Sequence, residues 1–360
     1  MKKYLVLFLA LPFLLASCEK EENETPEAKI TGHYVLNYGS YSSSVGSLSY
    51  IDLENSTVQN EIYKAVNGVD MSGKPQYAYE YQGDIYFMGN AVDEIYFVEA
   101  SSLEQTSNGV STDIIKPRFC VGEGNYLYIS CWGGDVWGDT SLGYIAKYNV
   151  TTNEVEKTID MPGGPEGLVI ANGTLFCALN YDTKIGMIDL ETEEVSFIEG
   201  VPGVSSYFLK DDEGNLFVSI PDTYSISATT AGLGYINTTT KTLEATYELS
   251  SITSNYSSIM SFNKDKSKIY VVGGSYDSFY NYSGGIYVFD TELKSFESEP
   301  LLTGVSGING VYFNKQTELV YVMVSQSTTA NGLLSFYNTN GELQEEFSTG
   351  IAPSWILDVE

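Results

Sequence analysis

The sequence predicts an all-β chain that folds as a seven-bladed β-propeller with four-stranded antiparallel blades, and three observations support this prediction. Short runs of β-branched and aromatic residues recur throughout the 360 residues without helical periodicity. A strand that ends in Asp, Asn or Glu before a polar turn occurs seven times. These marker residues lie 40 to 53 residues apart, a period typical of propeller blades. They are Asp52, Glu99, Asn149, Asp189, Asn237, Asp290 and Asn338.

The remaining strands of each blade follow from the same repeat. Ahead of most units, a tight hairpin such as YAYEYQGDIYFMG from Tyr77 supplies two inner strands, A and B. The marked strand is then C, and the strand after the polar turn is D. In one unit, residues 269–272 and 286–290 are the expected strands, and an aromatic loop joins them. Two separate β-sandwiches are the alternative, but the even spacing favours one ring.

The first blade is split between the two ends of the chain. Residues 33–38 form its B strand directly after the leader, and no A strand precedes them. The missing strand is the last segment, SWILDVE from Ser354. Pairing of this C-terminal strand with the N-terminal blade closes the ring and removes the exposed edge that an open array leaves. The propeller is expected to span residues 30–360.

The N-terminal residues read as a lipoprotein leader rather than as part of the propeller. Residues 1–17 carry two lysines and then an apolar run that is too short to span a bilayer, which predicts a signal peptide. The segment LASC, which ends at Cys18, resembles a bacterial lipobox, and this resemblance implies an acylated Cys18 that anchors the chain in a membrane. Residues 18–29 then form a flexible acidic tether.

Charge and cysteine content narrow the possible partners. The formal net charge is −29, and loss of the two leader lysines makes it −31. Nucleic acid and anionic lipid headgroups are therefore poor partners. Apart from Cys18, the chain holds Cys120, Cys131 and Cys177, which allow at most one intrachain disulfide and are expected as buried free thiols.

Loop composition predicts which face of the propeller binds a ligand. The A–B and C–D turns share one face and are short and polar, whereas the B–C and D–A connections share the other face and are long and aromatic. Aromatic rings in loops rich in Gly, Ser and Asp offer rigid stacking surface, as in antibody paratopes. The predicted ligand-binding residues on these loops are Tyr41, Trp132, Trp137, Tyr181, Tyr224, Tyr276, Phe279, Tyr280 and Tyr282.

The first residues of the A strands are expected to surround the mouth of the central channel on that same face. The alternative is that they are solvated loop ends that cap a water-filled channel. Aligning the A strands places seven residues in one ring: Gln76, Arg118, Glu166, Ser206, Ser257, Asn309 and Ser354. Of these, the predicted ligand-binding residues are Gln76, Arg118, Glu166, Asn309 and Ser354.

The sequence offers little for catalysis or metal binding. His33 is the only histidine, which disfavours a His-dependent triad, a multi-His zinc site and a His-ligated haem, and favours a structural or surface role. Asp135 and Asp139 have a spacing compatible with calcium, but a solvated loop is the preferred interpretation. We expect no enzyme, no catalytic residue, no metal and no cofactor. The alternative is a lyase or lactonase in which Glu166 acts as acid and Arg118 as electrophile.

Several of these features together resemble one family. The lipobox and acidic leader, the GYIAKYNVTTNEVEKTI type of repeat, the KPRFCVGEGNYLYIS hairpin and the split first blade are similar to the YncE-like seven-bladed propellers of the Bacteroidetes, in particular to BtuG-type surface lipoproteins. The resemblance implies capture of cobalamin or another corrinoid as a transported ligand, and delivery to a BtuB-type TonB-dependent outer-membrane transporter. It also implies a lipid-anchored protein of the outer membrane that faces the cell exterior.

The charge of the chain is compatible with this ligand. Cobalamin is bulky, carries many amides and lacks the high negative charge of ferric catecholate siderophores, which a chain at −31 disfavours. Capture of a ferric siderophore or a glycan is the alternative binding function. A structural or adhesive surface protein is a further alternative, and it is expected if the aromatic loops pack on one another.

Overall fold

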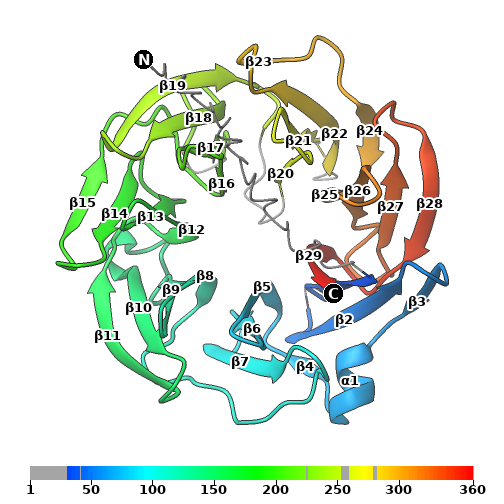
Figure 1. Cartoon of the computed structure of the whole chain (residues 1–360), viewed down its shortest axis with the longest axis horizontal. Coiled ribbons are helices and arrows are strands. Elements are labelled where there is room, and N and C mark those ends of the chain that lie inside the picture. The colour runs from blue at the N-terminus through cyan, green and yellow to red at the C-terminus, as the bar shows by residue number, and fades with distance from the viewer. Residues whose placement is uncertain (1–30, 41, 224–225, 253–258, 279–281, 360) are drawn as a thin grey trace, which may run out of the picture.

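A computed structural model describes residues 31–359 except residues 41, 224–225, 253–258 and 279–281. Seven antiparallel sheets stand around a central axis and form a closed ring (Figure 1). Helical structure in the described residues is limited to α1 (Ile62–Asn67) and the 3-10 helix η1 (Thr140–Leu142). Neither of these described helices has the length and apolar character needed to cross a membrane. The predicted all-β, seven-bladed propeller is confirmed.

Each blade places its innermost strand nearest the central axis and its outermost strand at the rim (Figure 1). Blade 1 consists of β29 (Pro353–Val359), β1 (Gly32–Asn37), β2 (Val45–Asp52) and β3 (Thr57–Gln59), with β4 (Met71–Ser72) also paired to β2. Blade 2 consists of β5 (Pro75–Tyr81), β6 (Asp84–Gly89) and β7 (Glu94–Glu99). Blade 3 consists of β8 (Pro117–Glu123), β9 (Tyr126–Cys131), β10 (Tyr144–Asn149) and β11 (Glu154–Asp160).

The other four blades continue round the ring in chain order. Blade 4 consists of β12 (Pro165–Ala171), β13 (Thr174–Leu179), β14 (Ile185–Asp189) and β15 (Val195–Ile198). Blade 5 consists of β16 (Phe208–Lys210), β17 (Leu216–Ile220), β18 (Gly232–Asn237) and β19 (Thr242–Glu248). Blade 6 consists of β20 (Met260–Phe262), β21 (Lys268–Tyr276), β22 (Tyr282–Asp290) and β23 (Ser295–Phe296), with β24 (Leu302–Ser306) also paired to β22. Blade 7 consists of β25 (Ile308–Asn314), β26 (Leu319–Val324), β27 (Leu333–Tyr337) and β28 (Leu343–Ser348).

The two ends of the described chain meet in blade 1. Strand β29 pairs antiparallel with β1, and Leu36 stands opposite Trp355. The backbone N–H of Thr31 donates to the carbonyl oxygen of Val359 over 2.8 Å, so the pairing continues one residue beyond β1. The predicted closure of the ring by the last strand is confirmed, and it covers the inner edge of β1.

The repeated Asp or Asn at the end of the C strand has a local structural cause. Asp189 Oδ1 accepts hydrogen bonds from the backbone N–H groups of Glu191 and Thr192, at 3.1 and 3.0 Å. Such an Asx turn reverses the chain between strands C and D. The corresponding turns in five further blades are capped by Asp52, Asn149, Asn237, Asp290 and Asn338.

Blade 2 is the exception, and it carries Glu99 at the marker position. Its sheet has three strands, and a single bridge between Ile95 and Val110 takes the place of a fourth. A glutamate side chain is one methylene longer than that of aspartate, and the Glu99 carboxylate accepts a hydrogen bond from the Ser102 hydroxyl at 2.7 Å. The segment that follows is rich in Ser, Thr, Gln and Asn, which favour a strand only weakly.

The core is divided among the interfaces between blades and an aromatic centre. Apolar residues on both faces of the sheets pack against neighbouring blades, because a propeller buries each sheet on both sides. At the centre, Tyr77, Phe119, Tyr207 and Trp355 come from four different blades, with ring centroids of contacting pairs 4.6 to 6.2 Å apart. Aromatic rings therefore pack across the middle of the propeller.

His33 lies in the seam where blade 1 meets blade 7. Its side chain is fully buried, with Nδ1 3.0 Å from Asp358 Oδ1 and Nε2 2.9 Å from Asn314 Nδ2. Asn314 Oδ1 accepts the backbone N–H groups of Gln316 and Thr317, so its Nδ2 donor faces the imidazole. Nε2 therefore accepts from Asn314, whereas Nδ1 faces the Asp358 carboxylate without a hydrogen-bond partner of good geometry among the described residues. We call His33, Asn314 and Asp358 the seam cluster, and the structural role expected of His33 is confirmed.

The three cysteines of the described chain are buried and free, as predicted. Burial raises the pKa of Cys120, Cys131 and Cys177, and it raises the pKa of Cys131 to about 12. All three thiols therefore stay protonated at neutral pH, which makes them poor nucleophiles and poor metal ligands.

Candidate ligand-binding site

The five ring residues predicted to bind a ligand lie at β-bulges. In β8 the register slips between Pro117 and Cys120, so that Arg118 and Phe119 stand opposite Ser130 alone. The inner strands of blades 1, 2, 4 and 7 slip in the same way. A bulge re-aims the side chains that it displaces. In these five blades the displaced residues include Gln76, Arg118, Glu166, Asn309 and Ser354.

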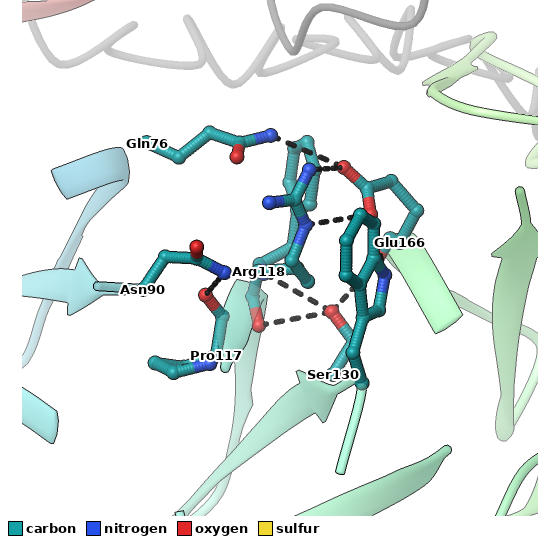
Figure 2. Close-up of polar contacts among 8 residues, drawn as sticks. Gln76, Asn90, Pro117, Arg118, Ser130 and Glu166 are labelled. Carbon is teal, nitrogen blue, oxygen red and sulfur yellow. Dashed lines mark hydrogen bonds and ion pairs between the residues drawn. The ribbon is translucent and has the colours of Figure 1, made fainter. Parts of the chain in front are cut away.

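A buried ion pair joins blades 3 and 4 at the mouth (Figure 2). Arg118 Nε donates to Glu166 Oε2 at 2.8 Å, and Arg118 Nη2 donates to Glu166 Oε1 at 2.6 Å. Glu166 is fully buried and Arg118 is 7% exposed. Removing two charges from water is costly, and only close, two-pronged geometry with additional hydrogen bonds offsets that cost. The bulges of adjacent blades provide this geometry by aiming the two side chains at each other.

Neighbouring side chains complete the hydrogen bonds of Glu166. Gln76 Nε2 donates to Oε1 and Trp132 Nε1 donates to Oε2, both at 3.1 Å. The Arg118 guanidinium also lies over the Trp132 ring, 4.0 Å from its centroid, in a cation–π contact. Ser130 Oγ donates to the backbone oxygen of Glu166 at 2.7 Å. The carboxylate therefore accepts four hydrogen bonds, and blades 2, 3 and 4 meet at it.

Aromatic rings continue from this pair to the surface. Tyr181 packs edge-on against Trp132 with ring centroids 5.7 Å apart, and Trp137 packs on Tyr181 at 6.2 Å. Trp137 is 77% exposed, although the adjacent Val136 is fully buried, so the loop is anchored while its indole stays in solvent. We call these residues the mouth cluster: Gln76, Arg118, Trp132, Trp137, Glu166 and Tyr181.

Electrostatics keep the tyrosine of the mouth cluster neutral. Burial raises the pKa of Tyr181, and the carboxylates of Glu166 and Asp135 raise it further, while the Arg118 guanidinium opposes them. The Tyr181 hydroxyl is therefore protonated at neutral pH and can donate or accept a hydrogen bond. The mouth cluster thus combines stacking rings with hydrogen-bonding groups beside an ion pair whose charges cancel.

The loop that carries Trp137 is held by its own carboxylates. Asp135 Oδ1 accepts the backbone N–H of Trp137 at 3.3 Å, and Asp139 Oδ1 accepts the N–H and the hydroxyl of Ser141 at 2.9 and 2.6 Å. These bonds cap turns, which accounts for both aspartates. Among the residues that the structure describes, no group of three or more His, Cys, Asp or Glu side chains is placed to hold a metal ion.

Two other predicted ring residues make structural contacts. Asn309 is 7% exposed, and its Nδ2 donates to the carbonyl oxygen of Pro353 at 2.6 Å, which ties blade 7 to blade 1. Ser354 is 5% exposed, and its hydroxyl donates to the carbonyl oxygen of Leu36 at 3.4 Å. They share the bulge position with Arg118, but they lie in blades 7 and 1, and these hydrogen bonds join them to backbone carbonyl groups of blade 1.

The aromatic stretch of blade 6 differs from its expected form. The two predicted strands are confirmed, but they are longer than expected, because β21 and β22 extend until Tyr276 and Tyr282 pair across the hairpin. Tyr282 is buried in the apolar core, at 8% exposure, whereas Tyr276 is 53% exposed and packs on Tyr282 with centroids 4.9 Å apart. Several predicted residues lie outside the described residues: Cys18, Tyr41, Tyr224, Ser257, Phe279 and Tyr280.

The sequence-based prediction of the site did not include two polar residues that lie beside the mouth cluster. Ser130 links blades 3 and 4, and its signal is a lone hydroxyl within the apolar run of β9. Asn180 follows β13 as Trp132 follows β9, and it is 3% exposed. Neither polar atom of the Asn180 side chain has a hydrogen-bond partner within the described part of the chain. A polar residue at the end of a B strand is the signal that points to it.

Two open clefts lie on the opposite face, between blades. One, of about 490 Å³, lies between blades 5 and 6, and the other, of about 420 Å³, lies between blades 6 and 7. Their charged side chains pair with one another, as Lys266 does with Asp212 and Lys268 with Glu297. Carboxylates outnumber lysines in the lining of the cleft between blades 5 and 6, whereas the mouth presents an exposed indole next to residues that hold a paired arginine. We therefore take the mouth as the candidate site.

Comparison with known proteins supplies the family. A family model described as a domain of unknown function (DUF5074) matches residues 31–350. The chain belongs to this family. The DUF5074 match begins before β1 and continues past β28, so it includes at least part of every blade and the whole mouth cluster.

Solved structures of similar shape share the propeller fold. A quinonprotein alcohol dehydrogenase-like protein from Bacteroides thetaiotaomicron matches with a TM-score of 0.67 and 16% identity, over 91% of this chain and 78% of that one. A Lactobacillus plantarum protein matches with 0.66 and 12%, over 92% and 100%. A Bacteroides uniformis protein provisionally named 6-phosphogluconolactonase matches with 0.62 and 10%, over 91% and 100%. These low identities show the fold alone. No curated protein matches the chain.

Proposed function

We propose that this DUF5074 propeller is a cell-surface lipoprotein that captures cobalamin or another corrinoid at the mouth cluster. It then passes the ligand to a BtuB-type TonB-dependent outer-membrane transporter. The ligand class comes from the resemblance to BtuG-type propellers. The observation that carries the site is the exposed indole of Trp137, at the end of a row of packed rings that leads inward to Arg118 and Glu166.

The chemistry of the mouth cluster supports a large, amide-rich ligand. A corrin ring has a broad apolar face, and stacking on an exposed indole buries that face at little cost in side-chain entropy. Its peripheral amides need donors and acceptors, which Tyr181 and Arg118 offer at the edge of the cluster. A ligand that is held by one solvent-exposed anchor and a few hydrogen bonds is also easy to release, as a transfer step requires.

The ligand is tested by direct binding to the chain from Ala28, which retains all seven described blades. We expect cyanocobalamin to co-elute with the protein on desalting and to titrate to one site in calorimetry. A ferric catecholate siderophore and a neutral oligosaccharide serve as competitors. If either of them displaces bound cobalamin or binds more tightly, the ligand class is wrong. If micromolar cyanocobalamin produces neither co-elution nor heat, the proposal fails.

The anchor is tested separately in cells. We expect the full chain to fractionate with the outer membrane and to be cut by a protease added outside intact cells. Cys18→Ser should release the protein from the membrane fraction because the thiol is the atom that is acylated. Equal membrane retention of the Cys18→Ser chain would contradict a lipid anchor at this residue, whatever the ligand result.

A further inference from the structure

The charge of the mouth cluster is set by one buried contact. Glu166 takes two of the five N–H donors of Arg118, through Nε and Nη2. The two side chains are 0% and 9% exposed, so little water screens their attraction. Among the described residues Arg118 Nη1 has no hydrogen-bond partner, and Figure 2 shows one guanidinium nitrogen that no dashed line reaches. The mouth therefore keeps free donors while its guanidinium charge is cancelled.

The two lysines nearest to the mouth in the sequence do not make the mouth net positive. Lys74 and Lys116 stand two residues before Gln76 and Arg118. Lys74 is 9% exposed, burial lowers its pKa, and its ammonium lies 5.4 Å from the centroid of the Tyr38 ring. The backbone N–H of Lys116 donates to Asp93 Oδ1 at 2.8 Å, which places a carboxylate beside this residue. Asp135 lies close enough to Tyr181 to raise the pKa of that hydroxyl, so it adds a second negative charge near the mouth.

We infer that Glu166 determines the ligand class of the mouth cluster. It cancels the charge of Arg118 and leaves Nη1 to donate, so the mouth selects an uncharged ligand with carbonyl or amide oxygens over one with phosphate or carboxylate groups. A neutral acceptor gains the hydrogen bond at Nη1. An anion at the same place gains it too, but it is repelled by the carboxylate of Glu166 across a poorly hydrated contact. The inference concerns the same site as the proposed function and rests on it.

The direct test is gain of anion binding when the carboxylate is neutralised. Glu166→Gln removes the charge and keeps the shape, and inorganic phosphate is the probe, titrated in calorimetry. We expect phosphate to bind Glu166→Gln at least about tenfold more tightly than wild type, because an unneutralised guanidinium binds phosphate strongly. Phosphate affinity equal to that of wild type in a folded Glu166→Gln protein overturns the inference.

A matched control separates local from global charge. Glu193→Gln also removes one carboxylate that pairs with cations, Lys147 and Lys157, but these lie on the outer strands of blade 3 and not at the mouth. We expect phosphate affinity of Glu193→Gln to stay within about twofold of wild type. An equal gain in both variants would mean that overall charge, and not the mouth, controls anion binding, and this would overturn the inference.

A second variant covers the case in which Glu166→Gln does not fold. Gln76→Lys adds a cation beside the intact pair at a half-buried position, and the inference expects it to gain phosphate binding at least about tenfold as well. If Gln76→Lys binds phosphate no more tightly than wild type while Glu166→Gln is unfolded by circular dichroism, the inference is overturned.

A further experiment uses the wild-type protein and depends on the proposed function. Cyanocobalamin is compared with a monocarboxylate derivative in which one peripheral amide has been hydrolysed, and we expect the amide form to bind at least about tenfold more tightly. Equal affinities contradict the inference and leave corrinoid capture standing. Absence of binding to both removes the proposed function, and the phosphate titrations still decide the role of Glu166.

Discussion

Two buried polar clusters join neighbouring blades in this propeller, and they differ in what they leave open. The seam cluster holds His33 between Asp358 and Asn314, and a polar atom lies within 3.0 Å of each imidazole nitrogen. The mouth cluster saturates the Glu166 carboxylate, yet it leaves Arg118 Nη1 without a partner among the described residues. At the outer end of its row of rings, the Trp137 indole is 77% exposed. Burial of polar groups between blades is therefore a structural device. An unfilled donor and an exposed ring within one cluster are what distinguish a binding site.

The largest expected effect comes from breaking the mouth pair. Glu166→Ala leaves the Arg118 guanidinium buried without its counter-charge, and it should lower the free energy of unfolding by about 3–5 kcal/mol. Urea denaturation followed by tryptophan fluorescence measures this. The double change Arg118→Met with Glu166→Leu removes both charges and should recover most of the loss. A loss below about 1 kcal/mol in Glu166→Ala would show that the pair is solvated.

Breaking the seam cluster should lower the free energy of unfolding by a smaller amount and should leave ligand affinity unchanged. His33→Ala removes a fully buried ring and leaves Asn314 Nδ2 without its imidazole partner, while Asp358 keeps its hydrogen bond from the Tyr312 hydroxyl. We expect this change to lower the free energy of unfolding by about 2–3 kcal/mol. Chemical denaturation gives the stability and cyanocobalamin titration gives the affinity. A weaker affinity in the folded His33→Ala protein would mean that the seam cluster and the mouth cluster are coupled, and that the seam cluster is not purely structural.

Removing the exposed indole should weaken ligand binding and leave the stability of the fold almost unchanged. Trp137→Ala should change the free energy of unfolding by less than about 0.5 kcal/mol, because the side chain is in solvent, and should weaken ligand binding by about 2 kcal/mol. The matched control is Leu293→Ala, since Leu293 is 76% exposed on the opposite face. Equal binding losses in both variants would point to a general effect of surface apolar area rather than to the mouth.

The smallest effect concerns pH and an ion triad outside both clusters. Hydrogen bonds from Lys147 and Lys157 hold the pKa of Glu193 at about 2, below its ordinary value of 4.5. A carboxylate with a lowered pKa stabilises the fold above its ordinary pKa, and this contribution is lost as pH falls from 4.5 toward about 2. Because the triad lies at the surface, we expect a loss of about 1 kcal/mol or less. Comparing wild type with Glu193→Gln between pH 6 and pH 2 measures it, and an identical pH profile in both would contradict the assignment.

Much of the fold could be predicted because each blade repeats a local interaction that needs particular residues. The Asx turn requires a short side chain with an oxygen, so Asp or Asn marks six of the blades. Glu99 departs from this rule in the blade whose fourth strand is reduced to one bridge. The residue at the marker position therefore distinguishes the incomplete blade 2 from the six blades with an Asx turn.

The ends of the strands in blade 6 could not be predicted from the sequence, because glycine can either end a strand or permit close approach of two paired strands. Gly273 and Gly274 read as a strand end, but they pair with Gly285 and Gly284 inside a continuous hairpin. A Cβ on Gly274 would lie 2.6 Å from the carbonyl oxygen of Ser283, so glycine permits a close approach of the two strands. The extended pairing then carries Tyr282 into the core, where the sequence predicted an exposed loop residue.

The candidate site was predictable in its membership but not in its contacts. Alignment of the inner strands placed Gln76, Arg118 and Glu166 in one ring, because equivalent positions of a repeat occupy equivalent places. The alignment could not show that the bulges of blades 3 and 4 turn Arg118 and Glu166 toward each other, since bulge geometry depends on the register of both strands. It also gave no sign that Trp132 would donate to the same carboxylate.

Ligand capture at the mouth is tested most directly by calorimetry of cyanocobalamin with three proteins: the wild-type chain from Ala28, Trp137→Ala and Leu293→Ala. We expect one site in the wild type, an affinity about 30-fold weaker in Trp137→Ala, and an unchanged affinity in Leu293→Ala. Equal affinity in all three proteins, or no binding in the wild type, would show that the mouth does not capture the corrinoid.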